Sequence, residues 1–108
     1  MKVKTSQETV KKLIELLERP DASKEQFLDN LPTPEKYAIL SMALIVRGDY
    51  EDLEIAYEES MLTVSARNLT KHLVNFPSLD CHLQDALRLK WPHFEVLWTD
   101  GNDKENED

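Results

Sequence analysis

The fold of this chain is decided by residues 33–48, which read TPEKYAILSMALIVRG. Nine of the ten residues from Tyr37 to Val46 are apolar. A helix that is apolar nearly all round is usually buried at the centre of a fold. We therefore expect residues 34–47 to form the third and most buried helix of the protein.

The ends of this stretch carry signals for helix boundaries. Thr33 and Pro34 are typical of the N-cap and the first helical position, where a proline loses no hydrogen bond. Arg47 suits the negative carboxyl end of a helix, and Gly48 can take the left-handed conformation that closes many helices. The chain is therefore predicted to leave this helix at Gly48. Another helix should begin after Asp49, its expected N-cap.

Two helices are predicted before residue 33, each with a capping box and a following proline. The first of them should start at Thr5 or Ser6. The boxes pair Thr5 with Glu8 and Ser23 with Gln26, spacings at which side chains satisfy free backbone N–H groups. A proline ends each helix because it lacks a backbone donor and restricts the residue before it. The residues at helical spacing that should face the core are Val10, Leu13, Ile14, Leu17, Phe27, Leu28 and Leu31.

Between Gly48 and Pro77 the sequence leaves two interpretations open. No glycine or proline interrupts this segment, so one long helix is compatible with it. A break at Thr63-Val64-Ser65, with Ser65 as a new cap, is equally compatible with the pattern. The inward stripe before the break is Leu53, Ala56, Tyr57, Ser60 and Val64. The stripe then shifts to Leu62, Ala66, Leu69, Leu73 and Phe76.

The last clear helix is predicted after Ser78, its expected cap, with an inward stripe of Leu79, Leu83, Ala86 and Leu87. Residues 100–108 contain five acids and no apolar residue, a composition typical of disorder. The sequence therefore predicts an all-α fold, a compact bundle of five or six helices. We expect a single helical domain over residues 1–99, followed by a short disordered acidic tail over residues 100–108.

Charge excludes several classes of function. The chain has 21 acidic and 13 basic residues, giving a formal net charge of −8. This charge repels phosphate backbones and anionic lipids, so no nucleic acid and no membrane is expected as a partner. No run approaches the roughly 20 apolar residues of a membrane span. A single cysteine and no apolar N-terminal signal predict a cytoplasmic protein.

Residues 35–89 resemble a bacterial family known only as a domain of unknown function. The resemblance rests on the acid-led apolar helix that ends in Val46-Arg47-Gly48-Asp49-Tyr50, on Ala56-Tyr57-Glu58-Glu59, and on Leu69-Thr70-Lys71-His72-Leu73 followed by Pro77. The family tends to have glycine in place of Val46 and tyrosine in place of His72. The resemblance implies an all-helical bacterial protein and brings no catalytic residue.

The residues suited to site chemistry are few and poorly spaced for it. His72, His82 and His93 with Cys81 lack the short paired spacings of zinc sites, and the adjacent Cys81 and His82 diverge on a helix. Cys81 is expected to be a buried or partly buried thiol. Acidic pairs such as Glu58-Glu59 are expected to be solvated, with acids spread along helix faces. No cofactor, metal or small molecule is therefore predicted.

The tripeptide Arg47-Gly48-Asp49 matches a motif that some adhesion receptors bind. Each of its residues already has a structural role here, as C-terminal cation, glycine cap and N-cap. We therefore interpret it as helix punctuation.

The most aromatic stretch of the chain runs from Trp91 to Trp98. Its large apolar residues are Trp91, Phe94, Leu97 and Trp98, and tryptophan is enriched at binding hot spots. They are expected either to close over the core or to contact a protein partner or a second copy.

The leading hypothesis is a non-enzymatic protein–protein interaction module in a bacterial cytoplasm, with a homodimer as one form. One alternative is an acidic inhibitor or immunity-type protein that binds a basic partner, which would need a contiguous acidic face. Another is a small enzyme whose site assembles only in space.

Overall fold

Six α-helices and two short helical turns make up residues 5–90, the part of the chain that the computed structural model describes. The helices are α1 (Gln7–Leu17), α2 (Ser23–Asn30), α3 (Thr33–Arg47), α4 (Leu53–Thr63), α5 (Leu69–Val74) and α6 (Leu79–Asp85). A 3₁₀ turn, η1 (Ala66–Asn68), precedes α5, and a π-helical turn, η2 (Ala86–Lys90), follows α6. No strand occurs over these residues, which confirms the predicted all-α bundle. The predicted tail, residues 100–108, lies outside them.

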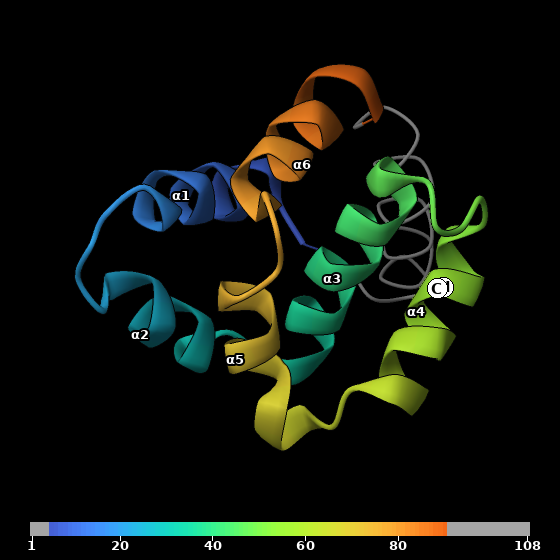
Figure 1. Ribbon diagram of the computed structural model, residues 1–108, viewed down its shortest axis with the longest axis horizontal. Helices are drawn as coiled ribbons and strands as arrows, with labels where there is room; N and C mark the ends of the chain where they lie inside the picture. The colour runs from blue at the N-terminus through green and yellow to red at the C-terminus, as the bar shows by residue number, and fades with distance from the viewer. Residues whose placement is uncertain (1–4, 91–108) are drawn as a thin grey trace, which may run out of the picture.

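The central element is α3, which has α4 on one side and α1 and α2 on the other (Figure 1). Residues 36–43 are buried without interruption, which confirms residues 34–47 as the most buried helix. The predicted N-cap at Thr33 is wrong, because Thr33 is already helical and Pro32 occupies the cap position. The Pro32 carbonyl accepts hydrogen bonds from the N–H groups of Glu35 and Lys36, so the helix begins one residue earlier.

Gly48 closes α3 in the left-handed conformation, with φ 99°, as predicted. Its N–H donates to the carbonyls of Leu44 and Ile45, each at 3.1 Å, and the N–H of Asp49 donates to Leu44 at 3.0 Å. Nothing lies within 4 Å of the place where a Cβ would stand. Glycine is therefore required here by backbone conformation and not by space.

The first capping box differs from the prediction. Ser6, not Thr5, is the N-cap of α1, and its Oγ accepts the N–H of Thr9 at 3.0 Å. The Thr5 hydroxyl instead donates to Glu35 Oε2 at 2.7 Å. The stripe of Val10, Leu13 and Ile14 is buried as expected, with Leu16 buried beside it.

The second capping box is also wrong. Ser23 is the first helical residue of α2 and caps nothing, while Asp21 Oδ1 accepts its N–H at 3.1 Å. The hydrogen bonds from the side chain and backbone of Ser23 hold the pKa of Asp21 below its usual value. The N–H of Gln26, which the predicted box assigned to the Ser23 hydroxyl, donates to the Ala22 carbonyl at 3.2 Å.

The predicted cap of α4 is wrong, because Asp49 binds a neighbouring side chain. Asp49 is engaged by Arg47, whose Nε donates to its Oδ2 at 3.0 Å. Asp52 caps the helix instead, and its Oδ1 accepts the N–H groups of Glu54 and Ile55 at 2.9 and 3.1 Å. The helix therefore begins at Leu53, three residues later than an Asp49 cap implies.

The structure resolves the open question over residues 50–76 in favour of a break. α4 ends at Thr63, and Val64 and Ser65 have extended backbones before η1. The hydroxyl of Tyr37 on α3 donates to the Val64 carbonyl inside the core. Ser65 stands at the predicted cap position but makes no side-chain capping bond.

Because of the break after Thr63, the second predicted stripe does not lie on one buried face. Leu69, Leu73 and Phe76 are buried as predicted, but Leu62 and Ala66 are exposed. Leu62 still belongs to α4, whose orientation is set by Leu53, Ala56 and Ser60 against the core, and it therefore points away from α3.

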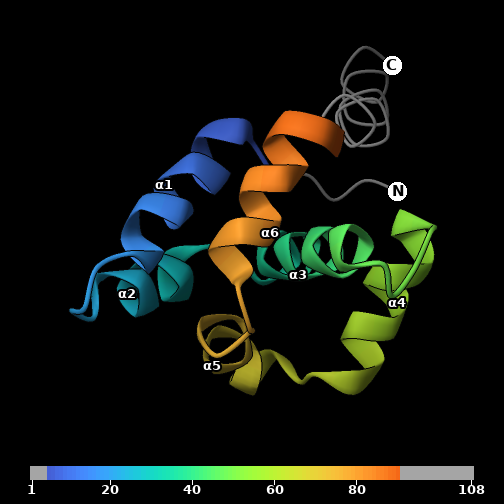
Figure 2. The same cartoon turned by 45° about the horizontal axis from the view of Figure 1, so that its top comes forward.

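The remaining core comes from α6 and its neighbours. Leu79, Leu83 and Ala86 are buried and Leu87 is partly buried, as expected. Ser78 occupies the predicted cap position, with φ 56° and no side-chain capping bond. Figure 2 shows α6 crossing over α3 between α1 and α4.

A buried lysine takes part in hydrogen bonds that link α3, α5 and α2. Lys36 of α3 is buried and donates from Nζ to the Thr70 hydroxyl at 3.4 Å. Thr70 of α5 donates in turn to Asp29 Oδ1 of α2 at 2.7 Å. Buried polar groups need such partners, so this relay helps to fix α2 and α5 against α3.

No helix in the part of the chain described by the structure has the length and apolar character needed to cross a membrane.

Candidate functional site

The interface predicted from the sequence at Trp91, Phe94, Leu97 and Trp98 lies outside the described residues, as does His93. It stays a prediction. The candidate surface described below comes from α4, which the sequence patterns did not single out.

The outer face of α4 carries large apolar side chains in contact with solvent. Leu62 is 79% exposed, Ile55 51% and Met61 45%. Ile55 and Leu62 are seven residues apart, two turns of a helix, so they share one face. That face is opposite the buried Leu53, Ala56 and Ser60. Met61 lies about 100° around the helix from Leu62 and so flanks this face. We call Ile55 and Leu62 the apolar patch.

Acidic residues surround the apolar patch. Residues 49–66 contain six acids and no lysine or arginine, so this segment carries −6 of the chain's formal −8. Successive residues on a helix are about 100° apart, which places Glu58 and Glu59 on either side of the Ile55–Leu62 line. The segment that contains α4 is therefore strongly acidic.

Two of the six acids are already engaged. Asp49 pairs with Arg47, and Asp52 accepts backbone hydrogen bonds at the start of α4. The other four, Glu51, Glu54, Glu58 and Glu59, take part in none of the ion pairs found among residues 5–90.

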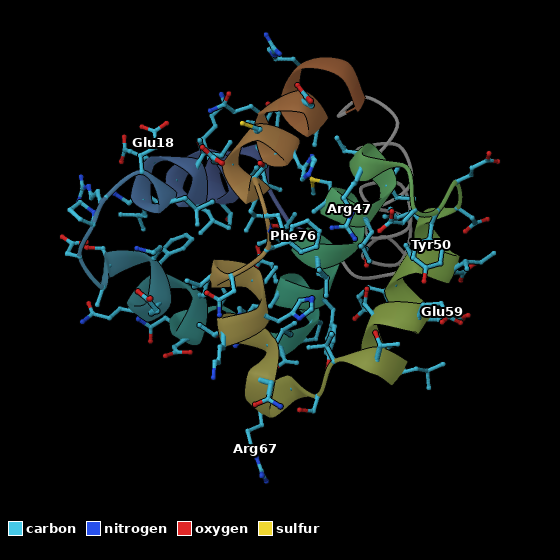
Figure 3. The ribbon with its side chains drawn as sticks, viewed as in Figure 1. Glu18, Arg47, Tyr50, Glu59, Arg67 and Phe76 are labelled. Carbon is cyan, nitrogen blue, oxygen red and sulfur yellow. The ribbon has the colours of Figure 1, made fainter. Side chains whose placement is uncertain are left out.

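A cleft adjoins α4 on the side that faces α5. It has a volume of about 700 Å³, and a second cleft of about 400 Å³ continues from it toward Pro77. The two clefts share Leu44, Arg47, Asn68 and His72 in their walls. Figure 3 shows Arg47 and Phe76 in the middle of this side of the molecule, with Tyr50 and Glu59 on the side of α4.

Three polar side chains of the clefts, Arg47, Ser60 and Thr63, make structural contacts. The guanidinium of Arg47 lies 4.6 Å from the centre of the Phe76 ring and also binds Asp49. The hydroxyls of Ser60 and Thr63 donate to the carbonyls of Ala56 and Glu59, one helical turn back. These two hydroxyls therefore bind the backbone of their own helix.

The structure supports the interpretation of Arg47-Gly48-Asp49 as helix punctuation. Arg47 stacks on Phe76 and binds Asp49, and Gly48 is the left-handed cap. The role of Asp49 differs from the prediction only in that it binds Arg47 and caps no helix.

The metal and thiol candidates do not converge. The rings of His72 and His82 each meet the Phe76 ring edge-on, with centroids 6.2 and 6.0 Å apart. Cys81 is exposed, so the expectation of a buried or partly buried thiol is wrong. Leu79 and Leu83 face the core, and Cys81, midway between them, points to the other side of α6. Among the described residues no three His, Cys, Asp or Glu side chains are grouped to hold a metal ion.

No family model, no curated protein and no solved structure matches this chain. The resemblance of residues 35–89 to a bacterial helical family is neither supported nor contradicted by these comparisons and stays a prediction.

Proposed function

We propose that this chain is a non-enzymatic protein–protein interaction module that binds its partner through the outer face of α4. The observation that carries the proposal is the exposure of Leu62, at 79%, on the same helix face as Ile55. Large apolar side chains grouped on a folded surface are typical of sites that another protein covers.

The position of α4 suits this role. The helix packs mainly against α3, the most buried helix, and this fixes its orientation. The acids around the apolar patch would form a polar rim, an arrangement common in interfaces.

An acidic inhibitor or immunity-type protein is a second candidate. The observation in its favour is the segment 49–66, whose six acids and lack of lysine and arginine give it a formal charge of −6. It is a special case of the same proposal, in which the partner is basic. The bacterial origin, the cytoplasmic location and a role for the Trp91–Trp98 stretch stay predictions.

The test is site-specific photocrosslinking in cells that make the protein naturally. A photoreactive amino acid replaces Leu62, and in a matched control it replaces Lys11, an exposed residue of α1. We expect a discrete crosslinked protein from position 62 and none from position 11. Loss of the product on replacing Ile55 with Ser would tie it to the apolar patch. The proposal is wrong if position 62 gives no discrete product, or gives the same product as position 11.

A further inference from the structure

We propose that the partner presents a basic amphipathic helix, with apolar side chains that cover Ile55 and Leu62 and with lysines or arginines that meet Glu58 and Glu59. This inference rests on the proposed function and specifies the chemistry of the partner.

The shape of the apolar patch favours a helix. Ile55 and Leu62 lie in line along α4, about 10 Å apart along its axis at 1.5 Å per residue. An amphipathic helix has apolar side chains at the same seven-residue repeat and can lie along such a line.

The charge around the apolar patch decides which helix fits. Glu51, Glu54 and Glu58 are exposed, Glu59 is partly exposed, and no lysine or arginine occurs from residue 49 to residue 66. A partner with cations beside its apolar stripe would neutralise these carboxylates on contact. Complementary charge of this kind chiefly raises the association rate and the specificity.

The same charges disfavour the other occupants of this face. A second copy docked through α4 would bring Glu58 and Glu59 against their own equivalents, and like charges repel. Nucleic acid and anionic lipid would meet the same repulsion. A protein partner with a basic surface would bind this face of α4 without such repulsion.

The experiment uses the full chain and two synthetic peptides. One is a helix of about 18 residues made only of leucine and lysine, with leucines at helical spacing, and its twin has glutamate in place of lysine. Binding is measured by fluorescence anisotropy at low and at physiological ionic strength. We expect the lysine peptide to bind more tightly than its twin and more weakly as salt is raised.

Three variants test whether binding occurs at α4. Replacing Leu62 with Ser should weaken binding by roughly tenfold or more, the loss expected for one buried leucine. The pair Glu58→Lys and Glu59→Lys should weaken it by a similar factor. The control pair Glu15→Lys and Glu18→Lys changes the net charge equally on exposed positions of α1 and should alter Kd by less than about threefold.

The outcomes separate this inference from the proposed function. Equal losses from both charge-reversed pairs, or none from Leu62→Ser, would show nonspecific attraction and overturn the inference. A photocrosslinked partner at position 62 that persists in the Glu58→Lys, Glu59→Lys variant would also overturn it and leave the interaction module standing. No crosslink at position 62 would overturn the proposed function itself.

Discussion

At the scale of single residues, Gly48 is the position whose identity the backbone constrains most directly. With φ 99° and no atom near the place of a Cβ, its cost of substitution is conformational and not steric. Gly48→Ala should lower the free energy of unfolding by about 1–2 kcal/mol, and Gly48→Asn by less, because asparagine tolerates left-handed backbone. Urea denaturation of both variants tests the order. An alanine variant as stable as the wild type would contradict it.

Single residues are also where the sequence predicted least well. The caps at Thr5 and Asp49 each had a second candidate close by, Ser6 and Asp52, that fits helix capping equally well. Which candidate caps is decided by partners far along the chain or across a turn, since Glu35 takes the hydroxyl of Thr5 and Arg47 takes Asp49. Local patterns do not contain those contacts.

At the scale of elements, the hydrogen bond from Tyr37 to the Val64 carbonyl holds the break after α4 against α3. Tyr37→Phe leaves that buried carbonyl without a partner and should cost about 1–3 kcal/mol of unfolding free energy. Tyr57→Phe is the matched control at neutral pH and should cost less. Equal losses from the two variants would show that the bond to Val64 does not matter.

The packing of α4 on α3 also gives a prediction for alkaline pH. Burial, and then the neighbouring Tyr37, raises the pKa of Tyr57 above its usual value of 10.0. The neutral phenol is favoured in the folded state, so this contribution to stability is complete below about pH 10. It is lost as pH rises through the higher pKa of the folded protein. Unfolding curves from pH 9 to pH 11 should fall less steeply for Tyr57→Phe than for the wild type.

The sequence predicted the helices themselves well, because the helical spacing of apolar residues and the proline, glycine and capping residues at helix ends mark them. The α3 segment has both an apolar run and terminal signals, so its extent was off by one residue. The break at Val64 was harder to predict because no glycine or proline marks it. It depends on Tyr37 reaching across from α3, a contact 27 residues away in sequence.

At the scale of the whole molecule, stability depends on the buried residues of α3 at the centre of the fold. Ala43 has no exposed surface, so Ala43→Glu would bury an unpaired charge and should cost several kcal/mol. Ala66→Glu, on an exposed turn, is the control and should change stability by no more than about 0.5 kcal/mol. Thermal melting compares the two. Similar melting of both variants would contradict the central placement of α3.

The candidate surface could be predicted only in part at this scale. The inward stripe of Leu53, Ala56 and Ser60 already implies that Ile55 lies on the opposite side of its helix. Whether another helix covers that side depends on how the chain returns after residue 64, and Leu62 was accordingly assigned to the interior. The apolar patch is exposed because the chain after residue 64 does not pass over it. The course of the chain beyond that point cannot be predicted from local sequence patterns.

The attachment of α4 has a consequence for its dynamics. Only Leu53 among its three buried side chains is large, and α3 is its main support. Helices held by so few apolar contacts open at a lower free energy than the global one. Backbone amides of α4 should therefore exchange with deuterium sooner than those of α3 in the free protein. A partner that closes over Leu62 would slow that exchange by mass action, so the amides of α4 would gain protection in the complex that they lack in the free protein.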